Sequence, residues 1–310
     1  MIYIIYDRER YAKNRVFADM LTEYCKKYGE TAETVLVEEF PYDRHLPHLA
    51  IMRAVAPDLG AYLTSHGVRV ANPTAAANLF NDKYSTYRYL ESHNIPLLPY
   101  RLIQSDENKP SLRDDEGIVP YNNKQLTHAD GSNERLSRRG RCPHRPAQNT
   151  ESTLNYGSNE FPQVFKSCDG HGGSEVFWVT DEADIRAAFQ KTQKTTAILQ
   201  APASDTGKDV RTYVIGKKII CSVMRSSTSD FRSNYSLGGR AAAYCLSDEE
   251  RKKVEEIISL FDFDFVGIDF IYDRGKPVVS EIEDVVGCRT VYRTAGIDLA
   301  ETYIKYLIGS

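Results

Sequence analysis

The sequence lacks an excess of charge of either sign. Its 310 residues contain 39 lysines and arginines against 43 aspartates and glutamates, which gives a formal net charge of −4. A chain without a global basic excess has no long-range attraction for nucleic acid or for an acidic membrane surface. We therefore expect no nucleic-acid partner and no membrane partner, and any polyanion must bind at a local site.

Long hydrophobic runs and cysteine pairs are also missing. The longest apolar stretches, such as residues 1–6 and 214–220, are strand-sized and far shorter than the ~20 residues that cross a bilayer. The first residues lack the charged start, long apolar segment and cleavage site of a signal peptide. The 6 cysteines are scattered and form no CxxC pair, which favours a reducing compartment over a disulfide framework. These absences predict a cytoplasmic protein.

The residues that are present form the pattern of a folded α/β and α+β protein. With 41% hydrophobic residues, the chain is long enough for about two domains. Alternating strand and helix signals predict a parallel α/β domain at 1–72, and a helical connection follows at 73–103. Residues 104–160 are polar and turn-rich, as in a flexible insert, and their basic run 135–141 is either a solvated loop or a contact for RNA or an acidic protein. Strand and helix patterns return over 161–310.

Three acidic residues stand out in the last predicted hairpin. Period-two alternation places Glu281 and Glu283 on one strand face and Ser280 on the other. With a three-residue loop at 274–276, Asp269 of the preceding strand lies opposite Glu281 and the carboxylates converge, whereas a two-residue loop places Asp269 opposite Ser280. Converging carboxylates need a neutralising cation, Mg²⁺ above all. The alternative is a solvated strand face.

A glycine-rich segment, KSCDGHGGS at 166–174, connects two predicted strands. Its glycines let backbone N–H groups approach phosphate oxygens, while Lys166 supplies a compact positive charge. The segment lacks the GxxxxGK[ST] pattern and no clear helix follows the glycines, which disfavours a P-loop enzyme. An ordinary glycine-rich hairpin turn is the alternative.

A set of arginines lies between the glycine-rich segment and the acidic hairpin. Arg211, Arg225 and Arg232 occur in and after a predicted hairpin that turns at Gly216, with Asn234 close behind. Guanidinium groups clamp phosphoryl groups and the developing charge of a tetrahedral intermediate. This order along the chain is expected of an enzyme that uses a magnesium nucleotide.

Six segments follow one another along the chain: NDKYSTYRYLESHNIPLLPY, PQVFKSCDGHGGSEVFWV, ILQAPASDTGKDVRTYVIGKKI, DFRSNYSLGG, FVGIDFIYD and EIEDVVG. In this order they resemble the ATP-grasp superfamily, most closely its RimK-type glutamate ligases. The resemblance covers about residues 50–308 except the insert. It implies an N-terminal α/β domain followed by two α+β subdomains that enclose ATP.

The resemblance also implies roles for individual residues. Lys83 and Lys166 match two lysines that contact ATP phosphates, and Asp269, Glu281 and Glu283 match the metal-binding positions. Arg225 and Arg232 are the predicted catalytic arginines. The other predicted nucleotide contacts are Gly172, Gly173 and Ser174 of the glycine loop, Gln200, Ala201, Pro202 and Ala203 of the adenine hinge, and Asp209, Arg211, Arg232, Ser233 and Asn234.

Two positions depart from the family pattern. The hinge usually carries an acid after its glutamine, whereas here Ala201 and Pro202 follow Gln200. The third metal position is usually asparagine, whereas here it is Glu283, which keeps an oxygen ligand and adds a negative charge.

Together these features predict carboxylate–amine ligation. ATP phosphorylates a carboxylate to an acyl phosphate, and an amine then displaces phosphate. The expected cofactors are ATP and Mg²⁺, with two metal ions and with Mn²⁺ as an alternative metal. Lys166 and Arg232 are expected on the phosphoryl oxygens, and Arg225 on the substrate carboxylate or the oxyanion. The substrates are expected to be small molecules, amino acids or peptides, and a homo-oligomer stays open.

Two other functions remain compatible with the sequence. One is an ATP-binding regulatory or assembly protein without ligase turnover, which the altered hinge and metal triplet suggest. The other is phosphoryl transfer to an alcohol, which would leave a stable phosphorylated product instead of an amide.

Overall fold

The structure is a computed structural model, and part of the chain is described. Most of the predicted insert lies outside the described residues, together with its basic run and the predicted nucleotide contact Asn234. The described residues are 1–105, 110–111, 160–228, 230–233 and 239–309.

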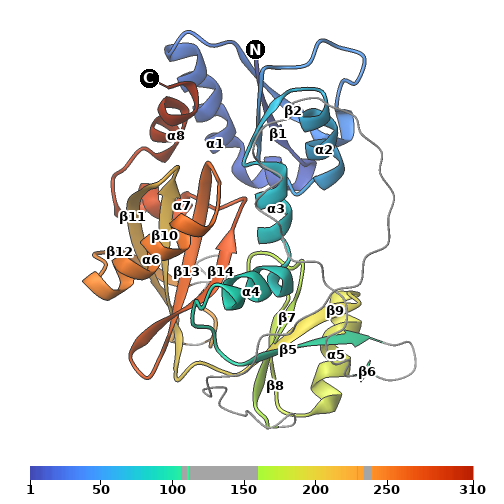
Figure 1. Ribbon diagram of the computed structural model, residues 1–310, viewed down its shortest axis with the longest axis vertical. Coiled ribbons are helices and arrows are strands. Elements are labelled where there is room, and N and C mark those ends of the chain that lie inside the picture. The colour runs from blue at the N-terminus through green and yellow to red at the C-terminus, as the bar shows by residue number, and fades with distance from the viewer. Residues whose placement is uncertain (106–109, 112–159, 229, 234–238, 310) are drawn as a thin grey trace, which may run out of the picture.

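Three separate sheets organise the described residues (Figure 1). The N-terminal strands form a four-stranded sheet at the top of the figure, in which all pairs are parallel. Two five-stranded antiparallel sheets follow, one at the bottom of the figure and one in its left-hand middle. This arrangement agrees with the prediction of an α/β portion followed by two α+β portions.

The N-terminal sheet has the strand order β2-β1-β3-β4. Its central strand β1 is completely buried, because every residue of IYIIY is apolar or aromatic. Asp7 then begins the first helix by accepting a hydrogen bond from the backbone N–H of Arg10. The elements are β1 (Ile2–Tyr6), α1 (Arg8–Lys27), β2 (Ala32–Leu36), the 3-10 turn η1 (Val37–Glu39), β3 (Leu49–Met52), α2 (Pro57–Ser65) and β4 (Arg69–Ala71).

Two helices lead into the second sheet, which lies at the bottom of Figure 1 and has the order β6-β5-β9-β7-β8. The second of them begins where Asp82 accepts a hydrogen bond from the N–H of Ser85, so Lys83 is its first residue. The region predicted as a helical connection at 73–103 thus contains these two helices. The elements are α3 (Thr74–Phe80), α4 (Lys83–Ser92), β5 (Tyr100–Ser105), β6 (Pro110–Ser111), β7 (Gln163–Ser167), β8 (Val176–Val179), α5 (Glu182–Thr192) and β9 (Thr196–Gln200).

The third sheet has the order β12-β11-β10-β13-β14 and carries one long amphipathic helix on its apolar face. That helix, α6, starts with a capping box, in which Ser247 and Glu250 bond reciprocally. The elements are β10 (Asp205–Ile215), β11 (Lys218–Ser226), β12 (Arg240–Tyr244), α6 (Asp248–Leu260), β13 (Phe265–Asp273), β14 (Lys276–Glu283), α7 (Arg289–Thr294) and α8 (Leu299–Ile308).

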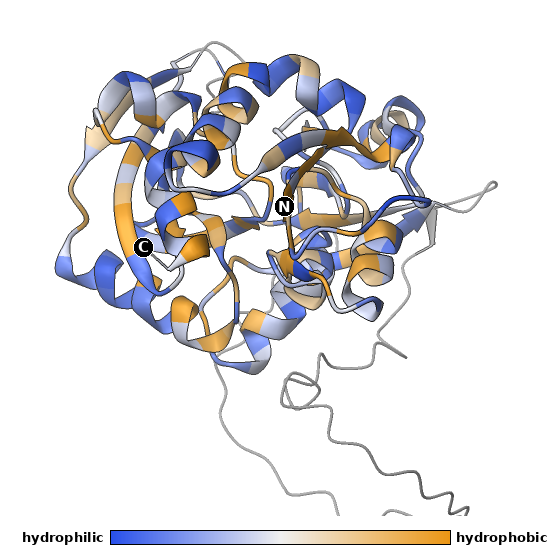
Figure 2. Cartoon of the chain, turned by 90° about the horizontal axis from the view of Figure 1, so that it is seen from above, coloured by the Kyte–Doolittle hydropathy of each residue, from blue (hydrophilic) through white to orange (hydrophobic). Residues whose placement is uncertain are grey.

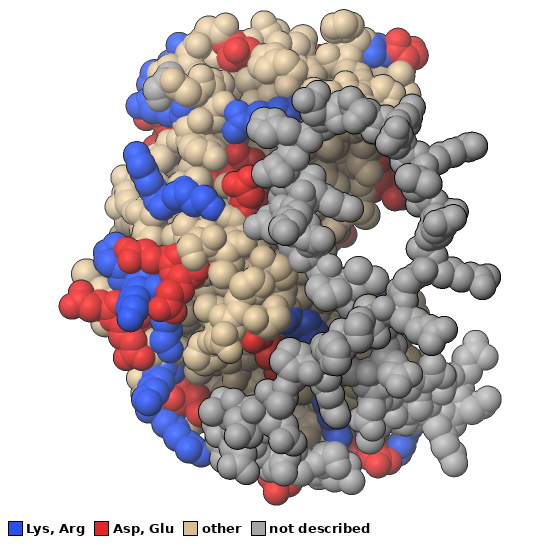
Figure 3. Space-filling view, viewed as in Figure 1, with Lys and Arg blue, Asp and Glu red and all other residues tan. Residues whose placement is uncertain are grey.

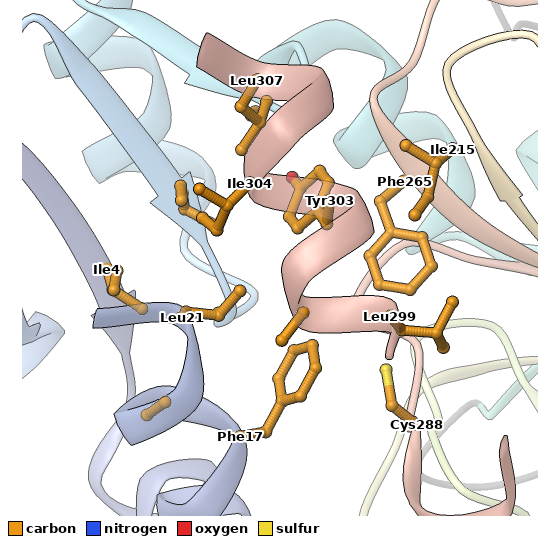
Figure 4. Close-up of a cluster of buried hydrophobic side chains, with 14 of the residues drawn as sticks. Ile4, Phe17, Leu21, Ile215, Phe265, Cys288, Leu299, Tyr303, Ile304 and Leu307 are labelled. Atoms are coloured by element: carbon orange, nitrogen blue, oxygen red, sulfur yellow. The ribbon is translucent and has the colours of Figure 1, made fainter. Parts of the chain in front are cut away.

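The last helix returns to the N-terminal sheet and joins it to the third sheet. Leu299, Tyr303 and Ile304 of α8 share one buried cluster with Leu21 of α1 and Phe265 of β13 (Figure 4). At the surface, Lys27 of α1 lies 2.6 Å from Glu301 of α8. The two ends of the chain are therefore packed together, and they support the third sheet from one side.

Hydropathy along the chain follows these layers. In Figure 2 the helices are two-coloured, whereas strand β1 beside the N-terminus is almost entirely hydrophobic.

None of the helices in the described part of the chain combines the length and the apolar composition needed to cross a membrane. Where the face in Figure 3 is not covered by grey atoms, positive and negative side chains are interspersed, in line with the small net charge.

The β13–β14 hairpin combines a two-residue turn with the pairing expected for a three-residue loop. Its turn residues are Arg274 and Gly275, both with positive φ, so the shorter of the two loops that the sequence left open is present. Asp269 nevertheless pairs with Glu281, because a β-bulge at Ser280 inserts one extra residue into β14. The bulge also overturns the predicted facing of Ser280, which lines the same cavity as Glu281.

Candidate functional site

A cavity opens between the second sheet and the third sheet. Its empty space, which includes solvent at the open side, is about 890 Å³. Its walls come from β7, β8 and the hinge on one side and from β10, β11, β13 and β14 on the other. The predicted site residues that line it are Lys83, Lys166, Gly173, Gln200, Ala201, Ala203, Asp209, Arg225, Arg232, Ser233, Asp269 and Glu281.

Five other predicted residues do not line the cavity. Gly172 and Ser174 belong to the glycine loop, and Pro202 to the hinge. Arg211 and Glu283 lie beside the cavity-lining acids and contact each other.

A chain of alternating charges crosses the third sheet. Arg211 binds Asp269 through two hydrogen bonds of 2.7 Å, and Arg225 donates a third bond of 2.7 Å to the same carboxylate. Arg225 also binds Asp209 at 2.6 and 2.8 Å, while Arg211 contacts Glu283. The order is Asp209, Arg225, Asp269, Arg211, Glu283. These arginines neutralise Asp269 and Glu283, two of the acids for which the sequence predicted a metal ion.

Burial and these arginines set the protonation of the acids. Burial works to raise the pKa of Asp269, but Arg211 and Arg225 overcome it and lower the pKa to about 2. Burial prevails at Glu283 and Asp209, whose pKa values are raised. Asp269 consequently stays ionised across the physiological range.

The two predicted phosphate lysines occupy different environments. Lys83 Nζ lies 3.0 Å from Glu281 and also donates a hydrogen bond to the carbonyl oxygen of Gly170. Burial alone would lower its pKa, yet Glu281 raises it above the ordinary value. Within the described ranges, Lys166 donates hydrogen bonds to two neutral groups, the Tyr87 hydroxyl at 3.4 Å and the Ser280 hydroxyl at 3.3 Å. Its burial lowers its pKa to about 8.

The glycine loop lies over this cluster and is tied to it. Gly172 and Gly173 have φ values of 66° and 77°, which L side chains rarely adopt. Arg232 Nη1 donates to the carbonyl oxygens of Gly173 at 3.0 Å and Val176 at 3.2 Å. Lys83 and Arg232 therefore hold the loop at both ends through its carbonyl groups.

Sequence reasoning missed several cavity-lining residues. Trp178 and Phe231 form an aromatic pair with ring centroids 5.4 Å apart. Period-two alternation in β8 was the available signal, because it places Trp178 on the same face as Val176. No comparable signal identified Glu175 at the end of the glycine loop, or Ser280 at the bulge.

A family model described as a RimK-like ATP-grasp domain matches residues 142–307, more than half of the chain. The chain belongs to the RimK-like ATP-grasp family. The predicted resemblance is thereby confirmed.

Curated relatives of this RimK-like chain include ligases. A probable alpha-L-glutamate ligase of Maridesulfovibrio salexigens is 29% identical over 150 residues, which cover 47% of this chain and 50% of the relative. An uncharacterized protein, the MG011 homolog of Mycoplasma pneumoniae, is 22% identical over 312 residues, covering 97% and 90%. The chain spans about half the length of the glutamate ligases that it matches.

Solved structures confirm the ATP-grasp fold. A RimK domain ATP-grasp protein from Sphaerobacter thermophilus superposes with a TM-score of 0.66 at 18% identity, and 98% of each chain is covered. D-alanine–D-alanine ligase from Bacillus anthracis, complexed with ATP, gives 0.65 at 11% identity, covering 99% of this chain and 96% of that one.

The acids of this RimK-like chain fit a metal ion by their chemistry. Among the residues that the structure describes, no group of three His, Cys, Asp or Glu side chains could hold an ion by itself. Asp269 and Glu281 nevertheless present carboxylate oxygens to the cavity. Mg²⁺ at nucleotide sites commonly takes one or two carboxylates and completes its shell with phosphate oxygens and water. The site therefore suits an ion that is bound together with a phosphate ligand.

Proposed function

We propose that this chain is an ATP-dependent carboxylate–amine ligase that joins an amino acid or peptide through an amide bond. The observation that carries the proposal is that positively charged side chains and carboxylates line one cavity together. Lys83, Lys166 and Arg232 lie around the glycine loop, and Asp269 and Glu281 lie opposite them. Family membership supports the nucleotide, and the relatives named alpha-L-glutamate ligase support L-glutamate as one substrate.

The charges of the site favour ATP bound with divalent metal ions. The site contains four acids and four basic groups, so their formal charges cancel. The acids are Asp209, Asp269, Glu281 and Glu283, and the basic groups are Lys83, Lys166, Arg211 and Arg225. A triphosphate alone would add negative charge to a neutral, mostly buried site. Mg²⁺ held by Asp269 and Glu281, with Glu283 adjacent, would offset that charge and stabilise the charge of the transferring phosphoryl group.

The chain's own groups provide positioning and charge neutralisation. Lys83 and Lys166 bind phosphate oxygens, and Arg232 orients the terminal phosphoryl group under the glycine loop. Arg225 is held on two carboxylates at 2.6 to 2.8 Å, so its guanidinium is oriented before substrate binds and can stabilise a carboxylate or an oxyanion. The attack of an amine on the acyl phosphate then forms the amide and releases phosphate.

Incubation with ATP, Mg²⁺ and a pool of amino acids and short peptides tests this proposal. We expect ADP release that requires both a carboxylate and an amine, and a product whose mass corresponds to loss of water between them. A stable phosphorylated product would instead indicate phosphoryl transfer. Nucleotide binding without turnover across the pool would support a regulatory or assembly role and contradict the ligase.

The affinity for ATP should fall as pH rises above about 8, because Lys166 loses its charge there. Its pKa of about 8 applies to the nucleotide-free protein, and a bound triphosphate favours the charged amine. Below that pH the charged form is present already. Above it each binding event must take up a proton, which weakens binding by up to about tenfold per pH unit. Calorimetric titration with MgATP across this range measures the slope.

A Lys166→Arg variant is the matched control, because its guanidinium stays charged throughout the range. Its affinity should vary less with pH than that of the wild type. Equal slopes for the two proteins would show that another group controls the pH dependence.

A further inference from the structure

Two oxygen atoms of cavity-lining residues have no hydrogen-bond partner among the residues that the structure describes. They are Oε2 of Glu175 and Oγ of Ser167, and both atoms are buried. Both residues line the cavity, and Ser167 is only 1% exposed. Buried polar atoms without partners are uncommon in proteins and cost free energy. Their position in a ligand cavity indicates that a bound group supplies the missing contact.

This pair lies at the glycine-loop end of the cavity. On β7, Val164 pairs with Gln200 of the hinge, and Ser167 is three residues further along, roughly 10 Å away at strand spacing. A Cβ atom added to Gly170 would lie 2.7 Å from Glu175 Oε2 and 3.1 Å from Ser167 Cβ. The same Gly170 accepts a hydrogen bond from Lys83. Glu175 is therefore close to the predicted phosphate contacts and remote from the adenine hinge.

The other described acids in the cavity already have basic partners. Asp209 and Asp269 bind arginines, Glu281 binds Lys83, and Asp205 lies 3.6 Å from Lys208. Glu175 has none.

The pKa of Lys194 is raised by its hydrogen bond to Asp169 and, to a lesser extent, by the charge of Glu175. Lys194 pairs with Asp169 at 2.7 Å and makes no ion pair with Glu175. Within the described cavity lining, Glu175 is thus the acid with an open acceptor atom.

A carboxylate at this end of the cavity would repel phosphate groups unless a positive group lies between them. The proposed reaction brings such a group, because an amine substrate is an ammonium ion at neutral pH. The ammonium must also lose a proton before its nitrogen can attack.

We propose that Glu175 binds the ammonium group of the amine substrate and takes its proton, with Ser167 Oγ as a second contact. This inference rests on the proposed ligase function. One ammonium proton moves to Glu175 Oε2. The nitrogen lone pair then forms the C–N bond at the acyl carbon, the bond from that carbon to the phosphate oxygen breaks, and the second proton leaves with the phosphate. Glu175 returns its proton to solvent.

A comparison of two nucleophiles tests Glu175 separately from the ligase. The probes are the ammonium-bearing amino acids and peptides of the pool, which give amides, and hydroxylamine, which gives hydroxamates. Hydroxylamine is uncharged at neutral pH, so no base is needed to free the lone pair of its nitrogen for attack. Glu175→Gln should lower amide formation about 100-fold or more, the scale of a lost general base, and leave hydroxamate formation close to wild type. Asp273→Asn, which changes an acid outside the cavity, should leave both products unchanged.

Each other result has a distinct meaning. Equal loss of both products in Glu175→Gln, or no loss of either, would overturn the role of Glu175 while the ligase stands. A Glu175→Asp variant that restores part of the amide formation would support the role of the carboxylate as base. A wild-type protein that forms neither amide nor hydroxamate would overturn the ligase itself, and the inference with it.

Discussion

An Asp269→Asn variant is expected to form no measurable ADP. Asp269 is 4% exposed, accepts three hydrogen bonds from Arg211 and Arg225, and faces the cavity beside Glu281. Asparagine keeps the size of the side chain but removes the charge that orients both guanidinium groups and that would hold the metal. Because a buried ion pair loses one partner, the free energy of unfolding should also fall by about 3–5 kcal/mol. Coupled ADP detection, MgATP binding and urea denaturation measure these effects separately.

Asp273→Asn is the matched control for this change. Asp273 ends the same strand β13 and accepts a hydrogen bond of 3.1 Å from the backbone N–H of Ser204, outside the arginine network. It should retain wild-type turnover and nearly wild-type stability. Normal turnover in Asp269→Asn would contradict the proposed metal and positioning role, whatever the change in stability.

The acidic hairpin shows how far local sequence patterns carry a structural prediction. Alternation in β14 correctly placed Glu281 and Glu283 on the face that Asp269 shares. The sequence did not decide the loop length, because Arg274 and Gly275 adopt positive φ without the usual Asn-Gly or Asp-Gly signal. The β-bulge at Ser280 then restored the pairing, and a bulge of this kind leaves no mark in hydrophobic periodicity.

The arginine network depends on pairing between strands that the sequence alone does not order. Asp209 pairs with Arg225 across β10 and β11, and Arg211 pairs with Asp269 across β10 and β13. The sequence shows only that Asp209 and Arg211 share a strand face. Their partners lie 16 and 58 residues further along the chain, so the neutralising role of the arginines required the sheet order β11-β10-β13-β14.

Lys83→Met should lower kcat/KM for ATP by about 100-fold or more, the usual cost of losing one preorganised donor to a transferring group. Lys83 is 7% exposed and is the basic partner of Glu281 at 3.0 Å. Methionine fills a similar volume without charge, so Glu281 would be left buried near Asp269 without a counter-ion. Because Lys83 is what holds the pKa of Glu281 below its ordinary value, that pKa should rise in the variant. Steady-state kinetics and the pH profile of MgATP binding measure both effects.

Lys194→Met provides the control on the other side of the glycine loop. Lys194 also pairs with an acid next to the loop, Asp169 at 2.7 Å, but its side chain is 34% exposed and does not line the cavity. Exposed ion pairs of this kind contribute about 1 kcal/mol or less, so its kinetics should stay close to wild type. Lys83→Arg keeps the charge and should recover part of the lost affinity. If Lys83→Met and Lys194→Met had equal effects, the loss would reflect a general disturbance of the loop, and the cavity lysine would have no special role in binding ATP.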